Sequence, residues 1–254
     1  MHLNNRNMVW SPSNGWIIHL KLLFVAATWG VGWTAGRVMA LGMDPISAAW
    51  VRYLIAFPLI MGWMVLAEGY RLPSRGEWKM IVTIGFLATF LYQILFMFGM
   101  QWTASGDASL VITFNPLFTA LLAIPFLGKR ITWRLMGGLG LGVIGISVIF
   151  TNSPNVHLPA DERLLGDVLI AIAALAWAMS SILMKQAMSS PAEDVESPLT
   201  PLALTVWASL VGLILLTPGA LWEVNSAGEL PSISREVWGA ILFLAIGSTV
   251  ISYV

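Results

Sequence analysis

Apolar residues gather along this chain in long runs, and short polar or Pro- and Gly-bearing segments separate one run from the next. A bilayer core of about 30 Å requires about 20 apolar residues when the chain crosses it as a helix, and the runs have this length. Strands of a membrane barrel would alternate apolar and polar residues over about ten positions, which no run does. The pattern therefore predicts an all-α integral membrane protein with eight spans: Ile17–Ala40, Pro45–Leu66, Met80–Trp102, Ala108–Leu127, Trp133–Thr151, Leu165–Met184, Leu199–Thr217 and Val237–Val254.

The composition also indicates a lipid environment. Hydrophobic residues make up 57% of the chain and charged residues 10%, whereas about 25% of the residues of a soluble domain are charged. The net charge is zero, so no basic excess indicates a nucleic-acid partner. The chain has no cysteine, which excludes disulfides and thiolate metal sites. Residues 1–16 lack an apolar core followed by a cleavage site, so we interpret the first run as a retained span.

Lysine and arginine are distributed unevenly between the two sides of the predicted bundle. If the N-terminus is cytoplasmic, nine of them fall on the cytoplasmic side and three on the other, with Arg52 inside a span. Basic residues are enriched in cytoplasmic loops, so the distribution predicts a multi-pass plasma-membrane protein with a cytoplasmic N-terminus. The nine are Arg6, Lys21, Arg71, Arg75, Lys79, Lys129, Arg130, Arg134 and Lys185, and the three are Arg37, Arg163 and Arg235.

The first and sixth spans carry related sequences. A shift of 148 residues aligns Trp29 with Trp177, and the next segments also run in parallel, with Asp44-Pro45 entering span 2 and Thr200-Pro201 entering span 7. A unit of five spans is odd, so the second unit must be inverted, and inverted repeats place a substrate path at their interface near the membrane midplane. The predicted segments are a cytoplasmic N-terminal segment (1–16), a first five-span repeat (17–151), a linker (152–163) and an incomplete second repeat with spans 6 to 8 (164–254).

Arg52 is the only formal charge well inside a predicted span, where an arginine costs about 2.5–3.5 kcal/mol on insertion scales. It should face the bundle interior, either as an anchor for a substrate carboxylate or as a structural partner of backbone carbonyls. Trp29 and Trp177 lie midway along their spans, away from the interfaces where tryptophan usually anchors. We therefore favour an aromatic cavity wall, which Trp33 and Ser181 join because each lies at i+4 from one of these tryptophans.

The third and fourth spans supply further candidates. Gln93 and Phe96 share a face of span 3, with Tyr92 beside them; the amide either joins helices or lines the path. Asn115 precedes Pro116, whose missing N–H frees a carbonyl one turn earlier, so this step is either a passive kink or a ligand site. The predicted substrate-binding residues are Trp29, Trp33, Arg52, Tyr92, Gln93, Phe96, Asn115, Trp177, Ser181 and Tyr253, the last matching Tyr92 in the repeat.

The glycines of span 5 spell GxGxxG at Gly140, Gly142 and Gly145. A dinucleotide fingerprint needs a strand before it and a helix after it, whereas this one lies inside an apolar run. Close helix packing is the better explanation, because Gly138 and Gly142 have the GxxxG spacing. The chain has no GxxxxGK[ST] motif for ATP, and its three histidines do not cluster with acids at a zinc spacing. We therefore expect neither cofactor nor metal.

Three segments carry a family resemblance that covers nearly the whole chain: Trp29-Gly30, AAWVRYLIAF around Arg52, and FGMQWTASGDASLVITFNPLFTALLAIPFLGKRIT (98–132). The sequence resembles the drug/metabolite transporter superfamily, specifically its EamA-type exporters, although the family usually has Glu where this chain has Lys129. The resemblance implies ten spans in a five-plus-five inverted repeat and export of amino acids and related metabolites. The last run stops at Val254 with no polar residue after it, so we expect spans 9 and 10 to be missing here.

The function that follows is a secondary transporter that exports a small metabolite by alternating access. Aromatic walls and a buried arginine suit a zwitterionic or carboxylate-bearing compound such as an amino acid. An intramembrane enzyme would need paired acids, HExxH or Ser with His at depth, and the predicted spans hold no acid except Asp167 near an edge. A lipid-packing or assembly protein stays open, since Trp and Gly can serve adhesion alone. The expected partners are the metabolite and membrane lipid, without nucleic acid, for a monomer or homodimer.

Overall fold

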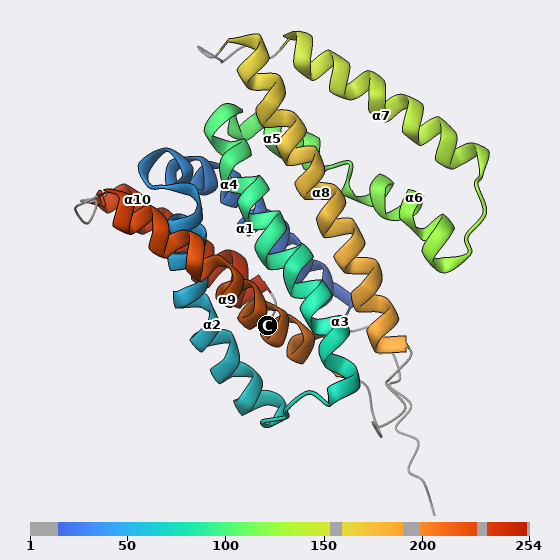
Figure 1. The fold of residues 1–254 in the computed structure, drawn as a ribbon. Helices are drawn as coiled ribbons and strands as arrows, with labels where there is room; N and C mark the ends of the chain where they lie inside the picture. Colours follow the sequence, from blue (N-terminus) through green and yellow to red (C-terminus); the bar gives the residue numbers. More distant parts are fainter. Residues whose placement is uncertain (1–14, 153–158, 190–198, 228–232, 253–254) are drawn as a thin grey trace, which may run out of the picture.

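The computed structural model describes residues 15–152, 159–189, 199–227 and 233–252. Within these ranges every regular element is helical and no strand is present (Figure 1), which confirms the predicted all-α class. Two of the elements are π-helical and carry the letter η. The elements are α1 (Gly15–Gly42), α2 (Pro45–Glu68), α3 (Arg75–Gly85), η2 (Phe86–Leu91), α4 (Tyr92–Trp102), α5 (Ser105–Ile112), α6 (Asn115–Leu127), α7 (Trp133–Asn152), α8 (Ala160–Ser189), α9 (Pro201–Ala227), α10 (Arg235–Leu242) and η3 (Phe243–Ile251).

Six helical stretches of the described chain are long and apolar enough to cross a membrane. The two other predicted spans fall on α7 and on α10 with η3, which are helical as well. The protein is therefore a multi-pass helical membrane protein, and the count of eight spans stays a prediction. The six stretches are Trp16–Gly42, Pro45–Glu68, Arg75–Trp102, Ser105–Leu127, Ala160–Ser189 and Pro201–Ala227.

Local sequence signals determine where several helices begin and end. α2 and α9 begin at Pro45 and Pro201, where the missing N–H of proline costs nothing. Ser74 caps α3 in a capping box with Glu77: each side chain accepts a hydrogen bond from the other residue's backbone N–H. Gly128 follows α6 with a φ of 63°, a left-handed conformation that glycine adopts without strain.

The predicted repeat has a structural parallel in the helices that contain the π segments. α3 begins after the N-cap Ser74 and continues through η2 into α4, while α10 begins after the N-cap Ser234 and continues into η3. Each π segment contains a buried threonine, Thr89 in η2 and Thr249 in η3. The two threonines are 160 residues apart in the sequence, and so are the two N-cap serines. This parallel agrees with the repeat, whose inverted arrangement stays a prediction.

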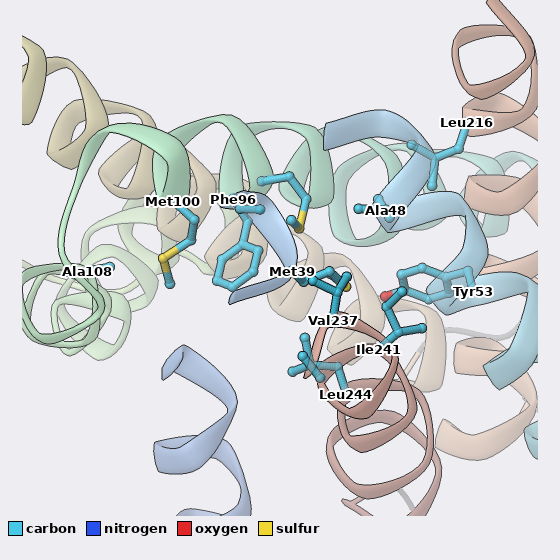
Figure 2. Close-up of a cluster of buried hydrophobic side chains, with 14 of the residues drawn as sticks. Met39, Ala48, Tyr53, Phe96, Met100, Ala108, Leu216, Val237, Ile241 and Leu244 are labelled. Carbon is cyan, nitrogen blue, oxygen red and sulfur yellow. The ribbon is translucent and has the colours of Figure 1, made fainter. Parts of the chain in front are cut away.

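The largest hydrophobic cluster joins helices that are far apart in the sequence. Figure 2 shows Val237, Ile241 and Leu244 of α10 and η3 beside Met39 of α1 and Tyr53 of α2. The cluster continues along α4 and α5 to Met97, Met100 and Ala108 and reaches Leu216 of α9. Its packing holds α1, α2, α4 and α10 around the centre of the bundle, where the candidate site lies.

Glycines allow close approaches between neighbouring elements. A Cβ on Gly36 would lie 2.6 Å from the ring of Phe96, and one on Gly142 would lie 2.4 Å from the ring of Phe114. A Cβ on Gly166 would lie 2.7 Å from the backbone carbonyl carbon of Trp102. Gly142 lies within the helix α7 and approaches the ring of Phe114, in agreement with the interpretation that it serves close packing.

The predicted fourth span is broken into two helices. α5 ends at Ile112 and α6 begins at Asn115, with Pro116 in its first turn. The break therefore falls at the Asn-Pro step that the sequence singled out, and it turns Ile112, Asn115 and Pro116 toward the bundle centre, where they line a cavity. α6 packs on α8, and α7 lies at the edge of the bundle against α5 and α6 (Figure 1).

Candidate functional site

A cavity of about 350 Å³ lies among α1, α2, α4, α5, α6, α8 and η3. Helices of both predicted repeats form its walls, since α8 and η3 come from the second. Its apolar and aromatic lining consists of Trp29, Gly32, Trp33, Tyr53, Tyr92, Phe96, Ile112, Pro116, Trp177 and Leu244, and its polar lining of Arg52, Gln93, Asn115, Ser248 and Thr249.

Aromatic rings form a continuous wall from α1 through α4 to α8. Trp33 packs edge-on against Phe96 with ring centroids 5.5 Å apart. Phe96 stacks on Tyr92, one helical turn earlier, at 5.8 Å, and Tyr92 contacts Trp177 at 5.3 Å. These distances lie within the range of favourable aromatic pairs. The wall offers an aromatic surface for the apolar body of a small molecule.

Arg52 is the single charged residue among the described residues that line the cavity. It lies in the second turn of α2 and is 8% exposed. Its Nη2 donates a hydrogen bond of 2.9 Å to Oγ1 of Thr249, and its Nη1 donates a longer one of 3.4 Å to Oε1 of Gln93. The guanidinium carbon also lies 5.5 Å from the ring centre of Tyr53, within the range of a cation–π contact.

Two buried polar atoms of the cavity lining lack a hydrogen-bond partner among the described residues. These are Nε of Arg52, which is a donor, and Oδ1 of Asn115, which is an acceptor. Buried polar groups are nearly always paired, and an unpaired one calls for an explanation. A bound molecule that carries both an acceptor and a donor would satisfy the two atoms.

Eight of the ten predicted site residues line this cavity: Trp29, Trp33, Arg52, Tyr92, Gln93, Phe96, Asn115 and Trp177. Ser181 does not. Its side chain is exposed, and its hydroxyl donates to the backbone carbonyl of Trp177 in the preceding turn. Tyr253 lies outside the described residues.

The structure adds the aromatic Tyr53 and the polar Ser248 and Thr249 to the predicted lining, together with Gly32, Ile112, Pro116 and Leu244. Tyr53 directly follows Arg52 in the sequence, and its position beside the buried arginine could have identified it as a candidate. Ser248 and Thr249 lie in the π-helical segment η3. A π-helix has a different period from an α-helix, so the i, i+4 argument could not place them on a face.

The groups that line the cavity are suited to binding a small molecule. The described lining has no Asp, Glu, His or Lys, so it offers no pair of groups that could act as nucleophile and base. It offers one positive charge, several neutral hydrogen-bonding groups and an aromatic wall. This set fits an anionic group attached to an apolar body.

Comparison with known proteins shows similarity to transporters. The model of the EamA-like transporter family matches residues 16–151 and 164–254. An uncharacterized transporter of Archaeoglobus fulgidus is 26% identical over 237 residues, which cover 93% of this chain and 77% of the relative. A relative in Escherichia coli K12, named a "Probable amino-acid metabolite efflux pump", is 26% identical over 238 residues, covering 91% of this chain and 74% of its own. A "Probable terminal-alkyne amino-acid exporter" of Streptantibioticus cattleyicolor is 30% identical over 128 residues, half of this chain and 43% of that protein.

Proposed function

Because the chain belongs to the EamA-like transporter family, as its sequence resemblance predicted, we propose that it is a secondary transporter that exports an amino acid or a related zwitterionic or carboxylate-bearing metabolite. The two relatives with named substrates are called an amino-acid metabolite pump and an amino-acid exporter. Those names support the substrate class but do not extend to a particular amino acid.

One observation carries the proposal: a buried arginine lies in an aromatic cavity whose described lining holds no carboxylate. An intramembrane charge is expensive and is normally paired. Among the described residues Arg52 has only neutral hydrogen-bond partners, Gln93 and Thr249, so a substrate carboxylate would supply the missing negative charge. The wall of Trp33, Phe96 and Tyr92 would hold the apolar part of the same molecule.

The transport mechanism we propose is alternating access around this cavity. Helices from both predicted repeats contribute to the walls, α1, α2 and α4 from the first and α8 and η3 from the second. A movement of one group against the other would expose the cavity to one side and then to the other. The orientation that goes with it is a cytoplasmic N-terminus in the plasma membrane, so that export runs from the N-terminal side.

The test is counterflow in proteoliposomes with a panel of the twenty radiolabelled amino acids. The wild type should accumulate one or more of them, and Arg52→Ala should abolish accumulation while the protein remains folded and reconstituted. Arg52→Lys should retain little activity, because a lysine cannot make a bidentate contact with a carboxylate. Lys129→Ala, at an exposed position after α6, serves as the control. Full activity of Arg52→Ala, or no counterflow with any amino acid, would refute the proposal.

A further inference from the structure

The hydrogen-bond partners of Arg52 are arranged so that each presents an acceptor to it. The hydroxyl of Thr249 donates its only hydrogen to the backbone carbonyl of Leu244, at 2.9 Å. The Thr249 oxygen is therefore left as an acceptor for Nη2 of Arg52. The amide of Gln93 donates from Nε2 to the hydroxyl of Tyr53 at 3.3 Å, which directs its Oε1 to Nη1 of Arg52.

The π-helical segment η3 places Thr249 in this role. In an α-helix a threonine hydroxyl bonds the carbonyl three or four residues earlier, whereas Thr249 bonds Leu244, five residues earlier. Thr89 in η2 lies 160 residues before it and is equally buried, but it packs against Gly212. The two threonines thus share a setting, and Thr249 is the one that accepts a hydrogen bond from Arg52.

We infer that Thr249 is a positioning residue, which acts with Gln93 to orient the guanidinium of Arg52 through neutral acceptors and so leaves its charge available to an anionic ligand. The inference rests on the proposed function in taking the cavity as the ligand site. Carboxylate partners would hold the arginine as well or better, but they would neutralise it. The unpartnered Nε of Arg52 is then the donor reserved for the ligand.

Two probes separate a role through Arg52 from direct contact with the ligand. 3-Phenylpropionate carries a carboxylate on a phenyl body, and 3-phenylpropan-1-ol has the same body without the charge. Their binding to the purified protein in detergent can be measured by isothermal titration calorimetry. We expect the wild type to bind the anion at least about tenfold more tightly than the alcohol, because hydrogen bonds to charged groups are the stronger ones.

Substitution of Thr249 should then weaken the binding of the anion and leave the binding of the alcohol unchanged. Thr249→Val keeps the shape but removes the acceptor, and we expect its affinity for 3-phenylpropionate to fall about tenfold, with no change for the alcohol. Thr249→Ser keeps the hydroxyl and should retain wild-type binding. Thr89→Val removes the same hydroxyl from the matched position in η2 and should leave both affinities unchanged.

Gln93→Glu tests the need for neutral partners. It places a carboxylate oxygen where the amide oxygen accepts from Arg52, so the protein should be at least as stable to heat, while 3-phenylpropionate binding falls at least about tenfold. If Gln93 only stabilises Arg52 structurally, the opposite is expected: the variant forms a stronger ion pair with Arg52 and still binds 3-phenylpropionate.

The inference is overturned if the wild type does not bind the anion more tightly than the alcohol, or if Thr249→Val binds the anion like the wild type. It is also overturned if the affinity of Thr249→Val falls equally for both probes. It is also overturned if Gln93→Glu keeps wild-type affinity for the anion. These outcomes are separate from the proposed function, which depends on counterflow of amino acids: a protein that binds the anion through Arg52 but transports no amino acid would leave the inference standing.

Discussion

The carboxylate of Glu223, near the end of α9, accepts a hydrogen bond of 2.6 Å from the backbone N–H of Ser47 in the first turn of α2. Its other oxygen accepts from the N–H of Ile46 at 3.2 Å. Asp44, the N-cap residue of α2, makes no side-chain cap bond, so the cap comes from another helix. At the opposite ends of the same two helices, Glu68 of α2 accepts a hydrogen bond of 2.5 Å from the hydroxyl of Thr200, just before α9.

We predict that Glu223→Gln destabilises the protein. An amide can accept through only one of its two terminal atoms, so one buried N–H of α2 loses its partner, and the negative charge at the helix N-terminus is lost as well. Leaving a buried donor unsatisfied costs roughly 1–3 kcal/mol. The measurement is the midpoint of thermal unfolding of the purified protein in detergent.

The control for this variant is Glu236→Gln. Glu236 lies in the first turn of α10, so the change removes the same charge from a helix start, but its side chain is exposed. Equal unfolding midpoints for the two variants would show that the contact between α9 and α2 contributes nothing beyond an ordinary helix-dipole effect.

Sequence reasoning succeeded best where an α-helical period holds. Trp29 and Trp33 were placed together by their i, i+4 spacing, and Gln93 and Phe96 by their shared face, and all four line the cavity. The same spacing placed Ser181 with Trp177, but Ser181 lies on the exposed side of α8. Periodicity identifies residues that share a face; it does not identify which face points inward when the chain has apolar residues all round.

The residues that were not predicted lie where a helix departs from the α-helical period or extends beyond its apolar run. Thr249 lies within a π-helical segment that no apolar period reveals. Glu223 lies beyond the predicted span, which stops at Thr217, whereas α9 continues through Pro218 to Ala227. A helix can extend past a proline when its neighbours satisfy the freed backbone groups, and this extension brings Glu223 to the start of α2.

A second prediction concerns the crossing of α4 and α8 at Gly166. A Cβ there would lie 2.7 Å from the carbonyl carbon of Trp102 and 2.8 Å from the amide nitrogen of Thr103. Both atoms belong to backbone and cannot rotate away, so Gly166→Ala should destabilise the protein by about 1–3 kcal/mol despite the higher helix propensity of alanine. Gly140→Ala in α7, where nothing lies within 4 Å of the added carbon, should be neutral or slightly stabilising. Equal unfolding midpoints for the two variants would contradict the close approach.

The predicted orientation can be tested because the chain has no cysteine of its own. A cysteine introduced by Arg75→Cys, at the exposed start of α3, should resist a membrane-impermeant maleimide in intact cells and react in inverted vesicles. Arg235→Cys, at the exposed start of α10, should show the reverse. Labelling of the Arg75 position from outside would show that the topology, and with it the direction of export, is the reverse of the predicted one.

The last prediction is that transport does not draw on a proton gradient. A proton-driven carrier usually holds an ionisable carboxylate along its path, because some group must bind and release the proton. The buried acids of the described chain are Glu77, Asp107, Asp167 and Glu223, and none of them lines the cavity. Elsewhere in the bundle, Glu77 caps α3, Asp167 accepts from Thr103 at 2.5 Å, and Glu223 caps α2.

We therefore expect facilitated diffusion or exchange that follows the gradient of the metabolite itself. Efflux from proteoliposomes should run at the same rate with and without an imposed pH gradient, and an unlabelled amino acid on the other side should accelerate it. Asp167→Asn should leave this behaviour unchanged, because its carboxylate joins α8 to the end of α4 and does not face the substrate. Strong stimulation by the pH gradient that disappears in Asp167→Asn would instead identify that carboxylate as a proton carrier and reject the prediction.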